Sequence, residues 1–273
     1  SSRRISALLQ DRSGILWVGT EDDGLYRLNP STGLFDHYQP SSTDPLTISS
    51  RNIRAIYEDK NGHLWIGGRN GINLFDRESE QFTRYQRDPG DSSSLSNDYV
   101  LSIFADHSGV LWFGTFGGGL SKYVQANERF NLFQHQPSVA SSLDNDIIYA
   151  VLEDQMGVVW VGTMDGGLNR LDPDTGNLTA LINNPADTNS LANNDVRALL
   201  EDQSGALWIG TYGGGLNRYD PRTGRFSRYL YNPNRPDSLS ESRVTALYED
   251  RAGNLWVGTR SGGLNLLDPQ TGQ

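Results

Sequence analysis

The chain has 273 residues and a formal net charge of −10, with 33 acidic and 23 basic side chains. Nucleic-acid-binding proteins carry a basic surface that displaces counterions from phosphates. The acidic composition therefore argues against a nucleic-acid-binding protein. The absence of cysteine excludes disulfides, thiolate metal sites and a cysteine nucleophile. No apolar run reaches the roughly 18 residues that a membrane helix needs, and no basic-then-apolar leader opens the chain at Ser1. We therefore expect any membrane segment to lie outside this sequence.

A motif of the type Leu-Trp-Val-Gly-Thr recurs along the whole chain. It contains all six tryptophans of the protein, which stand 47 or 48 residues apart at Trp17, Trp65, Trp112, Trp160, Trp208 and Trp256. A period of this length indicates a repeat architecture, in which each repeat is one structural unit.

Each repeat opens with an apolar run that ends at an acid, the first extending from Ile5 to Asp11. Its third residue is small in every repeat, as we expect for an inner strand where several sheets crowd around one axis. A tight turn follows, as in Asp202-Gln203-Ser204-Gly205, because aspartate bonds to the backbone nearby and glycine accepts positive φ.

The tryptophan motif itself predicts a second strand. It has no polar alternation before its last residue, which fits a sheet covered on both faces. We expect its tryptophan to fill the space between neighbouring sheets, where an aromatic ring buries roughly 150 to 250 Å².

Glycines such as 213–215 lead into a third strand, and a turn at 220–224 precedes a fourth strand at Phe226 to Tyr229. The turn has counterparts at 172–176 and 268–272, and its proline and glycine suit a type I turn followed by a left-handed residue. Longer polar loops, such as 184–191, connect the repeats. Four strands in about 40 to 50 residues are typical of a β-propeller blade, whereas a β-solenoid coil is usually shorter.

We therefore predict an all-β fold, a single β-propeller over residues 1–273 with six repeats of about 48 residues and four antiparallel strands per blade. The expected blade repeats are 1–48, 49–95, 96–143, 144–191, 192–239 and 240–273. The sixth repeat stops at Gln273, before its outer strand. Either the last blade has three strands, or the chain is part of a longer propeller.

The sequences at 203–211 and 214–221 closely resemble the two-component regulator propeller repeat, and the resemblance recurs six times over nearly the whole chain. It implies a periplasmic or otherwise extracytoplasmic sensor region of a bacterial membrane receptor, placed before a histidine kinase or a diguanylate cyclase. Several proteins of this family sense oligosaccharides. Their propellers are commonly seven-bladed and are followed by a β-sandwich and a membrane helix, so this six-repeat chain departs from the pattern and resembles the input module alone.

Residues shared by all repeats are explained by packing, so we expect a binding site where the repeats differ. In a four-stranded blade, the connection between strands two and three lies on the same face as the connection between blades. The residue after the tryptophan motif differs in every repeat, and going round a ring it is charged in three neighbouring blades and aromatic or apolar in the other three: Arg260, Glu21, Arg69, Phe116, Met164 and Tyr212.

The starts of the innermost strands add further side chains near the expected axis, namely Arg51, Asn52, Asp98, Tyr99, Asp146, Asp195 and Arg243. Aromatic faces beside forked guanidinium groups suit a sugar or a ligand with a carboxylate. The predicted ligand-binding residues are Glu21, Arg69, Phe116, Met164, Tyr212, Arg260, Arg51, Tyr99, Asp146, Asp195 and Arg243. The alternative is that these positions vary because nothing constrains them.

Neither a metal site nor a cofactor is predicted. The aspartates at 11, 59, 106, 154, 202 and 250 are expected to ring the opposite face. Calcium needs six or more oxygens that converge within about 2.5 Å, so we interpret these aspartates as turn caps.

The sequence predicts no enzyme, because its histidines are scattered at His37, His63, His107 and His135 and no nucleophile elbow or His-Glu-x-x-His pair occurs. Asp98, Asp146 and Asp195 leave a polysaccharide lyase or a glycosidase as an alternative.

The leading prediction is a non-enzymatic sensor propeller whose partner is a small molecule or an oligosaccharide. A protein–protein interaction scaffold is the other alternative, with a homodimer formed through the unpaired edge of the last blade. No nucleic-acid partner is expected, and membrane contact is expected only through segments absent from this chain.

Overall fold

The computed structural model describes residues 4–172 and 175–268, and in this part the chain forms 23 β-strands and no helix. None of the described residues therefore belongs to a helix that could cross a membrane. The chain divides into two compact units, unit 1 (Ser1–Phe133) and unit 2 (Gln134–Gln273).

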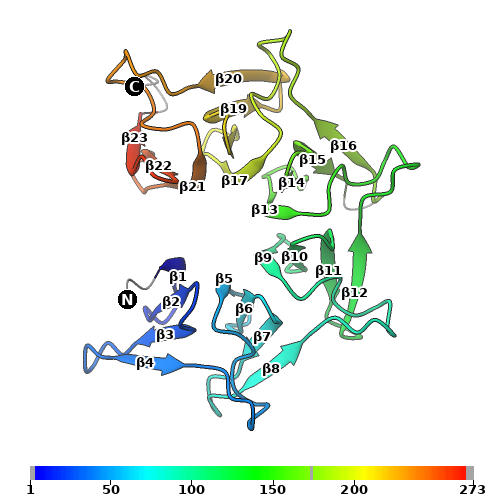
Figure 1. The fold of residues 1–273 in the computed structure, drawn as a ribbon, viewed down its shortest axis with the longest axis vertical. Coiled ribbons are helices and arrows are strands. Elements are labelled where there is room, and N and C mark those ends of the chain that lie inside the picture. Colours follow the sequence, from blue (N-terminus) through cyan, green and yellow to red (C-terminus); the bar gives the residue numbers. More distant parts are fainter. Residues whose placement is uncertain (1–3, 173–174, 269–273) are drawn as a thin grey trace. The chain divides into compact units, whose positions relative to one another are not determined.

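Unit 1 contains three antiparallel sheets of four strands, numbered here as blades one to three (Figure 1). Blade one comprises β1 (Ile5–Gln10), β2 (Leu16–Thr20), β3 (Leu25–Leu28) and β4 (Phe35–Tyr38). Blade two comprises β5 (Ile53–Glu58), β6 (Leu64–Gly68), β7 (Gly71–Phe75) and β8 (Phe82–Tyr85). Blade three comprises β9 (Val100–Ala105), β10 (Leu111–Thr115), β11 (Leu120–Val124) and β12 (Arg129–Phe133).

Unit 2 contains blades four to six. Blade four comprises β13 (Ile148–Glu153), β14 (Val159–Thr163), β15 (Leu168–Leu171) and β16 (Leu178–Leu181). Blade five comprises β17 (Val196–Glu201), β18 (Leu207–Thr211), β19 (Leu216–Asp220) and β20 (Arg225–Tyr229). Blade six comprises β21 (Val244–Glu249), β22 (Leu255–Thr259) and β23 (Leu264–Leu267), and its sheet has three strands within the described residues.

The predicted fold class, a six-bladed β-propeller with four antiparallel strands per blade and three in the last, is confirmed. The assignment of residues 1–273 to one domain and the homodimer through the last blade stay predictions. The predicted turn is present at 220–224, where the Gly224 N–H donates to the Asp220 carbonyl at 2.8 Å and Gly224 has a positive φ of 68°. Its counterparts at 172–176 and 268–272 include residues outside the described part of the chain.

The aspartate of each hairpin closes the turn between strands one and two. In blade five, Asp202 Oδ1 accepts the N–H groups of Ser204 at 2.8 Å and Ala206 at 3.1 Å. The predicted turn capping is thereby confirmed, and the inner strand ends one residue before the aspartate. The other oxygen of this carboxylate, Oδ2, accepts the indole N–H of Trp208 at 2.8 Å. This indole bond recurs at 2.8 to 3.1 Å in all six hairpins, from Trp17 to Asp11, Trp65 to Asp59, Trp112 to Asp106, Trp160 to Asp154, Trp208 to Asp202 and Trp256 to Asp250.

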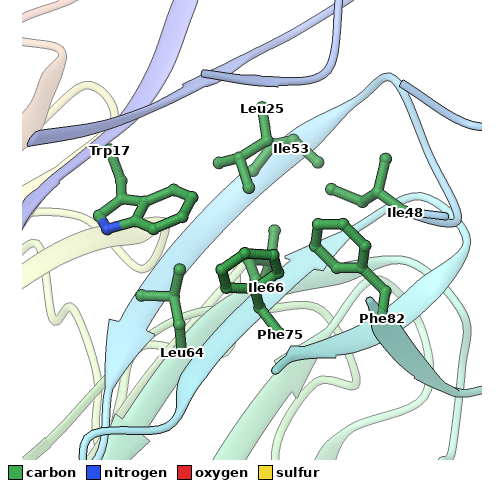
Figure 2. Close-up of a cluster of buried hydrophobic side chains, with 8 residues drawn as sticks. All are labelled: Trp17, Leu25, Ile48, Ile53, Leu64, Ile66, Phe75 and Phe82. Atoms are coloured by element: carbon green, nitrogen blue, oxygen red, sulfur yellow. The ribbon is translucent and has the colours of Figure 1, made fainter. Parts of the chain in front are cut away.

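The tryptophan of one blade packs on the next blade of the same unit. Figure 2 shows Trp17 of blade one in a buried cluster with Leu64, Ile66 and Phe75 of blade two. The Trp17 side chain is fully buried, and its ring centroid lies 5.3 Å from that of Phe75. Three further tryptophans pack on the following blade in the same way, namely Trp65, Trp160 and Trp208. The prediction that this residue fills the space between blades is confirmed within each unit.

The glycine of the tryptophan motif allows the next inner strand to approach. A Cβ atom added to Gly210 would lie 2.6 Å from Val244 Cγ1 of blade six and 3.2 Å from the Cβ of Ala198. Ala198 is the small third residue of the inner strand and pairs with Gly210 in the ladder. The small residue and the glycine together make room for a β-branched side chain of the neighbouring blade.

The glutamate before the hairpin aspartate connects neighbouring blades. Glu58 Oε2 accepts the N–H of Arg12 at 2.8 Å, and Glu201 Oε2 accepts the N–H of Gln155 at 2.9 Å. These carboxylates therefore bind the backbone of the preceding hairpin, a role that sequence analysis did not identify.

Candidate functional site

One backbone hydrogen bond marks the candidate face in every blade. The residue after the tryptophan motif donates its N–H to the carbonyl of the residue just before the inner strand, as from Tyr212 to Asp195 at 2.8 Å. The six bonds measure 2.8 to 3.2 Å and join Glu21 to Arg4, Arg69 to Asn52, Phe116 to Tyr99, Met164 to Ile147, Tyr212 to Asp195 and Arg260 to Arg243. The connection between strands two and three thus lies beside the start of strand one, at the edge of each sheet that we call the candidate face.

A β-bulge brings one more side chain per blade towards this face. In blade two the ladder shifts between Ile53 and Ala55, which leaves Arg54 as the extra residue. The equivalent residues of blades one to six are Ser6, Arg54, Leu101, Tyr149, Arg197 and Thr245. Bulges redirect side chains and are frequent next to functional sites. Sequence analysis missed this position, whose signal is a variable residue between an apolar and a small one.

In unit 1, the bulge arginine is held by two partners. Arg54 Nη1 donates to Glu21 Oε1 at 3.0 Å, and its Nε donates to the hydroxyl of Tyr99 at 3.1 Å. The second oxygen of Glu21 lies 3.5 Å from Arg4 Nη1. The predicted residue Glu21 therefore interacts with two arginines through its two carboxylate oxygens.

Two predicted residues lie against the ring of Tyr99, which was itself predicted. The guanidinium carbon of Arg69 lies 5.1 Å from the ring centroid, and the ring of Phe116 lies 5.5 Å from it at an angle of 35°. Phe116 is 43% exposed. The structure thus brings Glu21, Arg69, Tyr99 and Phe116 together, whereas Arg51 is exposed and does not join them.

Next to this cluster is a pocket of about 360 Å³. It is lined by Arg4, Glu21, Asp22, Asn52, Arg54 and Arg69. Its volume falls in the roughly 300 to 1,000 Å³ range of small-molecule pockets.

In unit 2, the bulge arginine lies between two aromatic rings. The guanidinium carbon of Arg197 is 3.6 Å from the ring centroid of Tyr149 and 4.7 Å from that of Tyr212. Its Nε and Nη2 donate to the two oxygens of Asp195 at 2.6 and 2.7 Å. Asp195, a predicted ligand-binding residue, therefore positions Arg197.

Two more predicted arginines approach the Tyr212 ring, with guanidinium carbons 5.8 Å (Arg243) and 5.4 Å (Arg260) from its centroid. Arg243 also donates to Glu241 and, at 3.1 Å, to the hydroxyl of Ser261. The structure thus joins Tyr212, Arg243 and Arg260 to the cluster around Arg197.

The other predicted side chains do not join these clusters. Asp146 Oδ1 accepts the N–H of His135 at 2.6 Å, and Asp98 Oδ1 accepts the N–H of Arg87 at 2.6 Å. At the equivalent position of the next repeat, Asn194 Oδ1 accepts the N–H of Asn183. The side chain at this position therefore fixes the loop between blades. Met164 is half-buried. Within residues 4–172 and 175–268, no three histidine, aspartate or glutamate side chains are placed to hold a metal ion.

Comparison with known proteins adds a family and a fold. A sequence profile described as two component regulator propeller matches more than half of the chain, at residues 1–22, 47–70, 94–117, 142–165, 190–213 and 238–261. No curated protein matches the chain.

Several solved structures have a similar fold. The extracellular domain of the putative hybrid two component system BT3049 from B. thetaiotaomicron has a TM-score of 0.74 and 23% identity, over 97% of this chain and 40% of that one. Virginiamycin B lyase from Staphylococcus aureus has a TM-score of 0.69 and 15% identity, over 98% of this chain and 82% of that one. PorZ, a surface component of the type-IX secretion system of Porphyromonas gingivalis, has a TM-score of 0.69 and 19% identity, over 95% of this chain and 38% of that one. The chain thus spans 40% of the length of the BT3049 domain.

Proposed function

Because the chain belongs to the two component regulator propeller family, we propose that it is a non-enzymatic sensor module that binds a small molecule or a glycan at the candidate face. The supporting observation is the clustering of arginine and tyrosine at positions that differ between blades. Tyr99 gathers Arg69 and Arg54 in unit 1, and Tyr212 gathers Arg197 and Arg260 in unit 2. Positions shared by the repeats are instead occupied with packing and turn capping.

The proposal places this module in a bacterial signal-transduction receptor, on the periplasmic or extracytoplasmic side. It is supported by the family and by the similar fold of the extracellular domain of BT3049, a putative hybrid two component system. Signal output and membrane attachment belong to other parts of such a receptor.

The engagement of the candidate carboxylates favours binding over catalysis. Asp146 accepts a backbone N–H, and both oxygens of Asp195 accept hydrogen bonds from Arg197. A general base must be within reach of a substrate proton, and these two carboxylates already have protein partners. The likeness to virginiamycin B lyase, at 15% identity, is one of fold.

The test is a ligand screen followed by substitution at the candidate face. A glycan array and a small-molecule library, read by thermal shift, identify the ligand. We expect Phe116→Ala, Tyr212→Ala or Arg69→Ala to weaken its binding about tenfold or more, measured by calorimetry. Arg251→Ala is the control, because Arg251 is exposed in the hairpin between β21 and β22, at the opposite edge of its sheet.

Unchanged binding in all three variants would contradict the proposal. So would turnover of an oligosaccharide that disappears in Asp195→Asn, since this result would make the protein an enzyme.

A further inference from the structure

Two arginines approach the Tyr99 ring of the candidate face. The guanidinium carbons of Arg54 and Arg69 lie 6.0 and 5.1 Å from the Tyr99 ring centroid. A neutral sugar that stacks on tyrosine needs an open ring face, whereas an arginine that stacks on a ring still presents the N–H groups at the edge of its planar fork. Around Tyr99, unit 1 therefore offers a ligand guanidinium N–H groups beside the exposed Phe116 ring.

The two arginines differ in how many of their N–H groups already have hydrogen-bond partners in the protein. Arg54 donates through Nη1 to Glu21 and through Nε to Tyr99, so its orientation is fixed within the protein. Arg69 is exposed and has no ion-pair partner among the described residues. Its five N–H donors, held over a tyrosine ring, match the two oxygens of a carboxylate.

The connection between strands that carries Arg69 is one residue shorter than in the other blades. Gly68 pairs with Gly71, so Arg69 and Asn70 form a two-residue connection between β6 and β7. A Cβ atom at Gly68 would lie 2.0 Å from the carbonyl oxygen of Asn52, which explains why glycine replaces the usual threonine. The Asn70 side chain donates to the Ser49 carbonyl at 2.9 Å. The single 47-residue gap of the repeat thus produces a tight turn that fixes the backbone of Arg69.

The charge of the adjoining pocket favours an anion. Its lining includes Arg4, Arg54 and Arg69 but only two carboxylates, Glu21 and Asp22. Glu21 is shared between Arg4 and Arg54, and the five charged groups together give the lining a formal charge of +1 in a chain of net charge −10.

We propose that the ligand bears a carboxylate and that the pocket of unit 1 binds this group, with Arg69 as a two-pronged donor. This inference rests on the proposed function and specifies its ligand class, for which a uronic acid oligosaccharide is the natural probe. Arg54 and Glu21 act as positioning residues, because they hold one another and Tyr99 beneath Arg69.

The experiment compares an oligogalacturonate with the same oligosaccharide after its carboxyl groups are reduced to alcohols. Calorimetry on the full chain is expected to show binding of the acid, and binding of the neutral form that is at least about tenfold weaker. Arg69→Gln should weaken binding of the acid about tenfold or more. Arg69→Lys should also lose most of the binding, since it keeps the charge but not the planar fork. Arg251→Gln, with the same charge change at the opposite sheet edge, should bind normally, and thermal melts verify folding of each variant.

Two results would overturn the inference. One is equal binding of both oligosaccharides with no effect of Arg69→Gln. This result rejects carboxylate recognition by Arg69, but the proposed function stands if Phe116→Ala weakens binding. Failure to bind the oligogalacturonate, together with no carboxylate-bearing compound among the ligands found by screening, also rejects it. If the same screen finds no ligand at all, the proposed function fails as well.

Discussion

At the scale of single residues, one aspartate per repeat combines two tasks. Asp202 caps its hairpin with one oxygen and orients Trp208 with the other. The residue is 6% exposed, so these bonds are largely shielded from water. Removing one acceptor from such a site leaves a buried N–H group without a partner. The resulting loss of unfolding free energy exceeds the net contribution of the hydrogen bond.

Asp202→Asn tests this account, because the amide keeps one acceptor oxygen and places an NH2 group against an N–H donor. We expect the variant to lose about 1 to 3 kcal/mol of unfolding free energy. Chemical denaturation measures the change. Asp22→Asn is the control, since Asp22 is exposed, and it should change stability by less than about 0.5 kcal/mol. Equal effects of the two substitutions would contradict the role given to Asp202.

At the scale of elements, the second strand of a blade depends on the first strand of the next. Val244 of β21 lies where a side chain on Gly210 of β18 would be, and β18 is buried along its whole length. The third residue of each inner strand is small for the same reason. The blades of one unit therefore fit through particular pairs of residues and not only through general apolarity.

Gly210→Ala should destabilise the protein by about 1 to 3 kcal/mol, because overpacking a rigid interface forces neighbours apart. Gly258→Ala is a matched control. It stands at the same position in blade six, but its added Cβ would meet only Ala246 of its own blade, at 3.2 Å. The double variant Gly210→Ala with Val244→Ala should show positive coupling in a denaturation cycle. Equal losses from the two glycine substitutions would refute this explanation.

At the scale of the whole molecule, the hairpin aspartates make stability depend on acid. For four of them, burial raises the pKa of the carboxyl, but hydrogen bonds from the indole and the turn backbone outweigh it and lower the pKa below the ordinary value: Asp11, Asp59, Asp106 and Asp202. At Asp250, hydrogen bonds from Asn254 and Trp256 lower the pKa to about 2. A carboxyl with a lowered folded-state pKa stabilises the fold above its unfolded pKa and loses this contribution as pH falls through the folded pKa.

The melting temperature should therefore be steady near neutrality and should fall as the pH is lowered from about 4 to about 2. Calorimetry across this range measures the slope. Asp202→Asn should show a shallower fall, since it has one such group fewer. A melting temperature that rises on acidification would contradict the assignment.

Much of the fold follows from the sequence because the signals are local. The aspartate and glycine of a hairpin lie three residues apart, and the buried strand is a run of five, so each repeat could be interpreted on its own. The edge that carries the candidate face was likewise expected, because a four-stranded antiparallel sheet places alternate connections at the same end. The structure confirms these features through the strands and their registers.

The composition of the clusters required the tertiary structure. Arg54 and Arg197 reach the candidate face only because a bulge redirects them. A bulge is a property of strand pairing, which a variable residue between an apolar and a small one signals but does not establish. Asp98 and Asp146 were expected near the axis like Asp195, but they stand one position earlier in their repeats, and each accepts a loop N–H group from 11 residues earlier in the chain.

Sequence alone therefore determined the repeat, the strands, the turns and the positions that vary, since these depend on residues a few places apart. Tertiary structure decided which of the varying side chains meet. Arg54 and Tyr99 are 45 residues apart in the chain, and only the packing of one blade on another brings them within hydrogen-bonding distance.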